Sequence, residues 1–309
     1  MKIIFMGTPD FAVHSLEVLK ERNDEVLLVV SQEDKPKGRG KKLQFTPVKE
    51  KALDYGYEVF QPKKVRESEA VEKLRSLNPD LIVVTAFGQI LTKEILDIPK
   101  YGCINVHASL LPRYRGAAPI NFAIINGEKK TGITTMYMAE GLDTGDMILS
   151  DEIEIAEDDT AGKLHDKLAI LSKKTLKETL DLIELGKAPR TVQDDSESNY
   201  APMMGKDLGH IDFRKKPKEI INLSRGVDPW PSSYAKLGDE VVKLFKIKIG
   251  NKTENKNYGE ILAVSSEYIE VVADGETVFI HEVQFPNKKR MLVKEYLKGN
   301  EIKTGEIFR

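Results

Sequence analysis

Cysteine is almost absent from this chain of 309 residues, and long apolar runs are missing altogether. A single cysteine, Cys103, excludes an internal disulfide and any cysteine-cluster metal site. No apolar run approaches the ~20 residues that a membrane-spanning helix needs. The opening, MKIIFMGTPDFAV, has the character of a first strand rather than of a secretory signal. We therefore expect a cytoplasmic protein with no membrane partner.

Several common enzyme motifs are missing as well. The first predicted strand is followed by GTPDFA, which has one glycine where the dinucleotide motif GxGxxG needs three, so we do not expect NAD. The sequence has no Walker loop, no HExxH zinc motif and no GxSxG nucleophile motif. We expect no bound metal.

The charge is close to balanced overall but is distributed unevenly. The net charge is −2; from Leu208 onward there are 18 Lys and Arg against 15 Asp and Glu, which leaves 29 against 34 in the rest of the chain. An acidic body with a basic C-terminal part fits a polyanionic partner, although random scatter of surface charge explains it equally well.

The first 185 or so residues alternate between strand-like and helix-like segments. Apolar runs separated by helices are typical of a parallel sheet that is covered on both faces, which predicts a doubly wound, mostly parallel, Rossmann-like α/β fold. Thr8 is expected to cap the first helix and Pro9 to occupy its first position. The predicted strands are 2–7, 25–31, 57–62, 79–88 and 101–109, with two more around a Gly-rich turn within 133–155. The predicted helices are 8–22, 46–56, 68–78 and 160–185, and a short segment is expected at 93–98.

The remainder of the chain changes character. Residues 189–207 lose hydrophobic periodicity and gather Pro, Ser and Asp, which indicates a linker. Beyond Leu208, short alternating strands separated by Gly, Asn and Asp predict a small, OB-like β-barrel. We therefore expect domains at 1–188 and 208–309, joined by a linker at 189–207.

Three polar residues of the predicted sheet domain suggest chemistry. Asn105 and His107 are two residues apart on a strand, so their side chains face the same way near its carboxyl end, where open α/β sheets place ligands. Taken alone, such a pair is more often structural than catalytic. Asp143, on a turn between Gly141 and Gly145, adds a carboxylate that can favour the charged imidazole. Together these groups can stabilise an oxyanion, and with no Ser or Cys paired to His107 they favour direct acyl transfer to an amine of the substrate.

Several motifs, in order along essentially the whole chain, resemble those of the folate-dependent formyltransferases. They are FMGTPDFAVHSLEVL, INVHASLLPRYRGAAPI, GLDTGDMI, NYAPMMGKDLGHIDF and SRGVDPWPSSYAKL. The chain departs from the family pattern at Asp228, at Ser232-Ser233 and at Tyr114, which puts contacts at the domain junction in doubt more than the reaction.

The resemblance implies roles for individual residues. Asn105, His107 and Asp143 fall on the family's catalytic positions, and would pass the formyl group of 10-formyltetrahydrofolate to an amine, releasing tetrahydrofolate. The residues that the resemblance places around the folate are Ser109, Leu110, Leu111 and Pro112, then Phe87, Gly88, Gln89, Ile90 and Leu91, and finally Glu140 and Gly141.

The acceptor has to be argued separately. Residues 31–51 hold seven basic residues against three acidic ones, and such a loop can follow a phosphate backbone. The tRNA-binding candidates in it are Lys35, Lys37, Arg39, Lys41 and Lys42. The family resemblance, together with this basic loop and a basic C-terminal barrel as a platform, implies initiator methionyl-tRNA as the acceptor, and we expect a monomeric protein. The alternatives are a nucleotide-sugar amine as acceptor, a non-catalytic RNA-binding protein, and a loop that is merely solvated charge.

Overall fold

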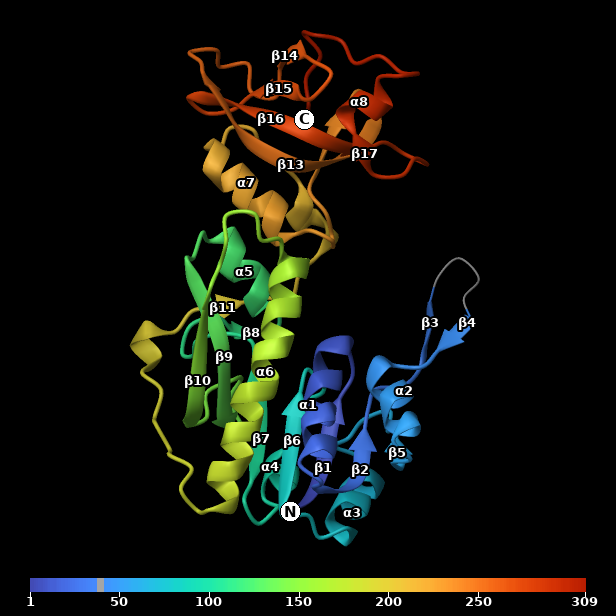
Figure 1. The fold of residues 1–309 in the computed structure, drawn as a ribbon, viewed down its shortest axis with the longest axis vertical. Coiled ribbons are helices and arrows are strands. Elements are labelled where there is room, and N and C mark those ends of the chain that lie inside the picture. The colour runs from blue at the N-terminus through green and yellow to red at the C-terminus, as the bar shows by residue number, and fades with distance from the viewer. Residues whose placement is uncertain (38–41) are drawn as a thin grey trace. The chain divides into compact units, whose positions relative to one another are not determined.

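The structure is a computed structural model that describes residues 1–37 and 42–309. The chain forms two compact units, each described here by itself (Figure 1). The N-terminal unit comprises residues 1–116, 131–153 and 165–201. The C-terminal unit comprises residues 117–130, 154–164 and 202–309, so it takes two short segments from the first half of the sequence. The predicted domains at 1–188 and 208–309 stay a prediction.

The N-terminal unit is built on a seven-stranded, mostly parallel sheet, as the sequence predicted. Strands β7, β6, β1, β2 and β5 run parallel, and β9 runs antiparallel to β7. In spatial order the strands are β10 (Met147–Glu154), β9 (Lys130–Tyr137), β7 (Cys103–His107), β6 (Leu81–Thr85), β1 (Lys2–Gly7), β2 (Glu25–Val30) and β5 (Val59–Phe60).

Helices cover both faces of this sheet (Figure 1). On one face, Ser15 of α1 hydrogen-bonds Thr85 of β6 at 2.9 Å, and Thr179 of α6 hydrogen-bonds Thr135 of β9 at 2.7 Å. On the other face, Leu74 of α3 packs in a buried cluster with apolar residues of β1 and β6. The helices are α1 (Asp10–Glu21), α2 (Pro47–Asp54), α3 (Ser68–Ser76), α4 (Lys93–Leu96) and α6 (Ala161–Glu184).

The starts of α1 and α2 show that the same local Thr-Pro pair sets the first residue of one helix but not of the other. At α2 the local Thr-Pro pair sets the start: the Thr46 side chain accepts a hydrogen bond from Lys49 N at 3.2 Å, and Pro47 begins the helix. At α1 the predicted cap is wrong, because the helix begins at Asp10 and Thr8 Oγ1 instead donates to the Phe87 carbonyl at 3.0 Å. A partner from a distant segment has replaced the local one.

The C-terminal unit is a six-stranded antiparallel sheet that the chain's last residues close into a barrel. Phe308 N donates to Gly259 O beside β14, and Arg309 exchanges backbone hydrogen bonds with Lys236 of β12, so both sheet edges are paired. The strands are β12 (Tyr234–Leu237), β13 (Glu240–Lys252), β16 (Glu276–Gln284), β15 (Ile269–Val272) and β14 (Ile261–Val264), with β17 (Met291–Leu292) beside β16, and the short helix α8 (Val293–Tyr296) follows.

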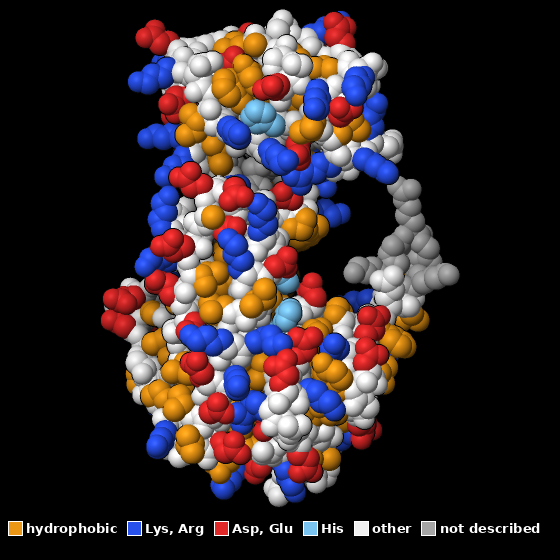
Figure 2. Space-filling view, viewed as in Figure 1, with side chains coloured by type: hydrophobic (Ala, Val, Ile, Leu, Met, Phe, Trp, Pro, Cys, Tyr) orange, Lys and Arg blue, Asp and Glu red, His pale blue; other side chains and the backbone are white. Residues whose placement is uncertain are grey.

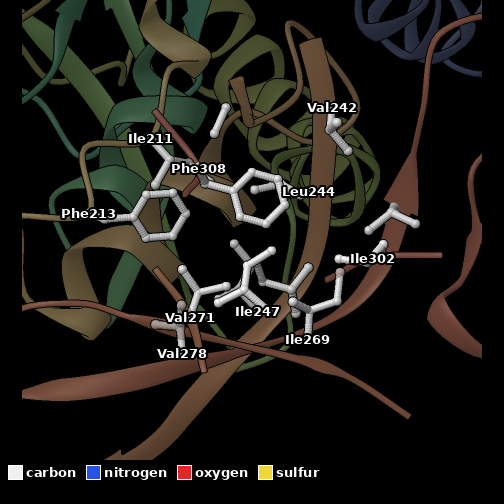
Figure 3. Packing of buried hydrophobic residues seen from close by; sticks show 14 of the residues in the cluster. Ile211, Phe213, Val242, Leu244, Ile247, Ile269, Val271, Val278, Ile302 and Phe308 are labelled. Atoms are coloured by element: carbon white, nitrogen blue, oxygen red, sulfur yellow. The ribbon is translucent and has the colours of Figure 1, made fainter. Parts of the chain in front are cut away.

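The barrel interior is apolar. Phe213 and Phe308 stack with their ring centroids 6.1 Å apart, among aliphatic side chains from the strands (Figure 3). The alternating strand pattern predicted this core, but the sequence reading missed helix α7 (Pro217–Gly226). Asn121 of α5 (Pro119–Ile125) donates to Gly226 O at 2.8 Å, which ties α5 to the end of α7 within this unit.

Shorter elements lie in segments that the sequence marked as loops. Residues 35–37 and 42–44 form the two arms of a β-hairpin, β3 (Lys35–Lys37) and β4 (Lys42–Gln44), in a segment that the sequence marked as a loop. The predicted linker contains one short 3₁₀ turn, η1 (Asp195–Glu197), and β11 (Tyr200–Ala201), which pairs with β8 (Arg115–Gly116). A second 3₁₀ turn, η2 (Lys206–Gly209), begins at its end. Among the residues that the structure describes, no helix is long and apolar enough to cross a membrane.

Candidate active site

The candidate site lies at the carboxyl end of β7, close to where the strand order of the sheet changes direction. From β1 the chain continues outward through β2 and β5 on one side, and through β6 and β7 on the other. Open α/β sheets bind ligands beside such a point, outside the carboxyl ends of their strands. Asn105 and His107 project from the same face of β7 as Cys103, which lies in the buried cluster on that face.

His107 is held by a backbone carbonyl and faces a carboxylate. Its side chain is 6% exposed, and Nε2 lies 2.9 Å from the Tyr114 carbonyl oxygen. Because a carbonyl oxygen only accepts, Nε2 carries a hydrogen. Tyr114 itself has a left-handed backbone, φ +59°, which belongs to the turn that presents this oxygen. Nδ1 lies 3.6 Å from Asp143 Oδ2, beyond hydrogen-bond range, so this nitrogen has room for another partner.

Asp143 lies between the other two candidate residues. Its Oδ2 accepts a hydrogen bond from Gly116 N at 2.8 Å, and its Oδ1 is 3.4 Å from Asn105 Nδ2. The backbone at Asp143 is left-handed, φ +52°, a conformation that Asp tolerates better than most residues. The structure thus brings together Asn105, His107 and Asp143, although Asp143 lies 38 residues after Asn105 in the sequence.

The loop after β6 is anchored through side chains that leave its main chain available. Phe87 and Leu91 are buried, while Ile90 is 77% exposed. The Gln89 side chain accepts from Val65 N at 2.7 Å, which ties the loop to a neighbouring segment. The backbone N–H groups of residues 88–91 donate no hydrogen bond to any residue that the structure describes. This loop therefore offers main-chain groups, rather than side chains, to a planar ligand.

The loop after β7 is fixed by a buried hydroxyl. Thr134 Oγ1 donates to Ser109 O at 2.7 Å and accepts from Leu111 N at 3.2 Å. Ser109 Oγ donates to Arg113 O at 2.6 Å, so the Ser109 hydroxyl closes its own turn. Leu110 and Pro112 are half-buried.

Two further residues that the family resemblance placed at the folate, Glu140 and Gly141, are exposed on the loop before Asp143. Glu140 lines a pocket of about 310 Å³, the lower end of the size range of small-molecule sites. Asn105, His107 and Asp143 are not among the residues that line this pocket, which reaches Cys103 at the amino end of β7. Its remaining lining residues are Lys93, Leu96, Asp97, Gly102, Tyr137, Met138, Ala139 and Arg190.

The predicted tRNA-binding residues lie on the β3–β4 hairpin or fall outside the described residues. Lys35 is exposed on β3, and Lys37 and Lys42 are paired backbone positions of the two arms. Arg39 and Lys41 lie outside the described residues. At the base of the hairpin, Lys49 Nζ donates to Asp34 Oδ2 at 2.5 Å and to Gln61 Oε1 at 2.7 Å, which fixes where the arms leave the unit.

The C-terminal barrel carries basic residues, but several are already paired. Figure 2 shows Lys and Arg side chains of this unit interspersed with Asp and Glu. Arg290 donates to Glu282 at 2.7 Å and to Asp228 at 3.0 Å, and Lys246 also pairs with Glu282. Burial raises the pKa of Glu282, but hydrogen bonds and charges from Lys246 and Arg290 outweigh it and hold this pKa below its ordinary value. Arg290 and Lys246 are therefore less available to a phosphate than an unpaired basic residue would be.

Sequence reasoning missed the contribution of the predicted linker. Asn199 Oδ1 accepts a hydrogen bond from Tyr114 N, the residue whose carbonyl holds His107. Gln193, 7% exposed, contacts both Arg115 and the Asp143 turn. A single sequence gives little warning of this, because polar side chains in an aperiodic stretch are normally solvated. Within residues 1–37 and 42–309, no group of His, Cys, Asp and Glu side chains is arranged to hold a metal ion.

Comparison with known proteins identifies the class. Residues 1–180 match the family model described as "Formyl transferase", and residues 203–301 match "Formyl transferase, C-terminal domain". The chain belongs to the formyl transferase family.

Within that family, the chain is similar along its whole length to proteins named methionyl-tRNA formyltransferase. It is 59% identical over 307 residues to that of Clostridioides difficile (strain 630), with 99% of both chains covered, and 52% identical over 308 residues to that of Alkaliphilus oremlandii, also with 99% of both covered. Among solved structures, the Helicobacter canadensis N-formyltransferase, in complex with folinic acid and dTDP-3-aminofucose, superposes with a TM-score of 0.69 at 21% identity, covering 91% of this chain and 98% of that one. At this identity the superposition shows a shared fold.

Proposed function

We propose that this protein transfers the formyl group of 10-formyltetrahydrofolate to the amino group of the methionyl moiety of initiator methionyl-tRNA, for translation initiation. The observation that carries the proposal is the convergence of Asn105, His107 and Asp143 at the carboxyl end of β7, two nitrogen donors around one carboxylate. The sequence identity of 59% and 52%, over almost the full length of the chain, to proteins named methionyl-tRNA formyltransferase supports the acceptor.

The described residues fit a folate. A pterin ring has donors and acceptors along its edge, and the main-chain groups of Gly88–Leu91 offer the matching partners on an anchored loop. Glu140 and Gly141, on the loop that leads into Asp143, would frame the ring from the other side, and the exposed Ile90 and the half-buried Leu110 would supply apolar contacts. Bound there, 10-formyltetrahydrofolate supplies the formyl group.

Asn105 and His107 would stabilise charge on the formyl oxygen. As the amine nitrogen bonds to the formyl carbon, negative charge develops on that oxygen before the bond to folate N10 breaks. One Asn105 Nδ2 hydrogen is directed at Asp143, which leaves the second for the oxygen. His107 uses Nε2 on the Tyr114 carbonyl, so Nδ1–H is the hydrogen that it would donate. The proposed role therefore requires the doubly protonated ring.

Asp143 would hold both donors in place. Its carboxylate lies opposite His107 Nδ1 and Asn105 Nδ2, and it is itself fixed by Gly116 N at 2.8 Å. The net reaction moves one proton from the amine to the departing folate N10. An α-amino group has a pKa near ~7.7, and an ester lowers it further, so no strong base is needed to free its lone pair.

The β3–β4 hairpin and the C-terminal barrel would bind the tRNA. Lys35, with Lys37 and Lys42 in the two arms, makes the hairpin suited to a phosphate backbone, and Arg39 and Lys41 belong to the same proposal. A nucleotide-sugar amine does not require such a basic arm. Because one chain carries all three residues of the site, we propose that the monomer is active.

Product identification tests this function. Purified protein would be incubated with 10-formyltetrahydrofolate and charged initiator tRNA, and the aminoacyl group would be released by base and examined by mass spectrometry. N-formylmethionine is expected. Free methionine alone, with 10-formyltetrahydrofolate unconsumed, would contradict the proposal.

A further inference from the structure

A buried glutamine joins the two segments that hold His107 and Asp143. Gln193 lies beyond α6 in the stretch that the sequence marked as a linker. Its Nε2 donates to the carbonyl oxygens of Asp143 at 2.8 Å and Gly145 at 2.7 Å. Its Oε1 accepts from Arg115 Nε at 3.0 Å and Nη2 at 2.8 Å. One side-chain amide thus spans the Asp143 turn and the segment around Arg115.

Arg115 stands between the two backbone groups that orient the site. The residue before it supplies the carbonyl that accepts from His107 Nε2, and the residue after it supplies the N–H that donates to Asp143 Oδ2. The Arg115 side chain is 11% exposed and also pairs with Asp195 at 2.7 Å. Fixing the guanidinium therefore fixes the stretch that positions both His107 and the carboxylate.

The hydrogen bonds of Gln193 allow only one orientation of its amide. Both N–H groups point at carbonyl oxygens, and the oxygen receives two guanidinium N–H groups, so the full capacity of the side chain is used. Reversing the amide would set its oxygen against two carbonyls and its NH₂ against a cation. The left-handed Asp143 backbone, φ +52°, needs such support because non-glycine residues adopt it at a cost.

We propose that Gln193 is a positioning residue for formyl transfer, which sets the Asp143 carboxylate in register with Asn105 and His107. This inference rests on the proposed function. It assigns the aperiodic segment a part in the reaction, beyond joining two domains.

Two substitutions separate the hydrogen bonds of Gln193. Gln193→Glu keeps an acceptor for Arg115 but places an oxygen against the carbonyls of Asp143 and Gly145, so the turn must shift. Gln193→Met keeps the approximate length of the side chain, adds no charge, and removes the hydrogen bonds to the two carbonyl oxygens and from Arg115. A displacement of ~1 Å in a catalytic group can lower turnover on the order of 100-fold. For both variants we expect kcat to fall by that order, while KM values for methionyl-tRNA and 10-formyltetrahydrofolate stay at the wild-type level.

Matched controls distinguish positioning from loss of stability. Val192→Ala changes an adjacent side chain that is 78% exposed, and should leave kcat and Tm unchanged. Leu176→Ala removes a fully buried side chain of α6, and should lower Tm while kcat per folded molecule stays at the wild-type value. If the Gln193 variants behave like Leu176→Ala, with lower Tm and normal kcat per folded molecule, Gln193 is only structural and the inference is wrong.

Failure of this inference and failure of the proposed function give different results. The wild-type protein is assayed in parallel with initiator methionyl-tRNA. An inactive wild type would overturn the proposed function, and the inference with it. An active wild type with equally active Gln193→Glu and Gln193→Met variants would overturn the inference alone.

Discussion

Replacing His107 with alanine perturbs the proposed chemistry most directly. The substitution removes the proposed Nδ1 donor, which lies 3.6 Å from Asp143 Oδ2, and also the buried 2.9 Å hydrogen bond from Nε2 to the Tyr114 carbonyl. Loss of one oxyanion donor lowers kcat by about 10²–10³-fold, or about 2.7–4 kcal/mol of transition-state stabilisation. Loss of this hydrogen bond should in addition lower the free energy of unfolding by about 0.5–1.5 kcal/mol.

These two effects can be measured separately. Single-turnover formyl transfer at saturating substrates gives the loss in the chemical step, and denaturant unfolding gives the loss in stability. Filter binding should show tRNA affinity near the wild-type value, because the hairpin and the barrel do not depend on the imidazole.

Asn105→Ala provides the matched comparison. Its single contact to Asp143 is long, 3.4 Å, so it should lower kcat with a smaller loss of stability than His107→Ala. If both donors act on one oxygen, the loss in the double variant should differ from the sum of the single losses. Near-wild-type single-turnover rates in His107→Ala would refute the assigned site.

Three other predictions test separate parts of the structure. Lys35→Ala on the exposed hairpin arm should weaken tRNA binding and lower the magnitude of the slope of log K against log salt by about 0.7–0.9. Lys100→Ala, at another exposed lysine, should leave that slope unchanged. Equal slopes for the two variants would show that the hairpin lysine is solvated and makes no phosphate contact. The pKa of Glu282 is lowered in the folded protein, so its ion pairs stabilise the fold above the unfolded-state pKa of ~4.3, and this stabilisation is lost as pH falls through the folded-state pKa. Glu282→Gln should therefore flatten the fall in unfolding free energy on the acid side. An unchanged pH profile would contradict the stabilising role of the Glu282 pairs with Lys246 and Arg290. Gly145→Ala would place a Cβ 1.7 Å from a β9 carbonyl oxygen and should destabilise the fold by about 1–3 kcal/mol or more. Gly205→Ala, with open space around it, should leave the stability unchanged. Equal unfolding midpoints for the two variants would show that the turn at Gly145 is built differently.

Periodicity and residue chemistry predicted most of the N-terminal fold. Buried strands such as β1 and β6 are almost entirely apolar, and Thr46-Pro47 is a strong local start signal, so these elements followed from the sequence. Thr8 has the same local pattern, yet its hydroxyl has a tertiary partner in Phe87, and the predicted cap was wrong. Helix α7 was missed because its amphipathic stretch lies among strand-like segments.

The candidate site was predictable to the extent that its residues carry chemistry. Asn105 and His107 share a strand face through simple alternation, and their meeting with Asp143 is now seen in the structure. The role of Gln193 could not be predicted, because it depends on where a polar, aperiodic segment docks. Neither the Tyr114 carbonyl nor the Gly116 amide has a sequence signature, since any residue provides these groups.

A competition assay tests the central claim most directly. Purified protein would receive 10-formyltetrahydrofolate with a labelled formyl group, together with equal concentrations of initiator methionyl-tRNA and a 4-amino-sugar nucleotide, and the label on each acceptor would be counted over time. The proposed function predicts label on the methionyl-tRNA and none on the sugar. Label on the sugar nucleotide instead would contradict it, and would leave the site at the end of β7 with a different acceptor.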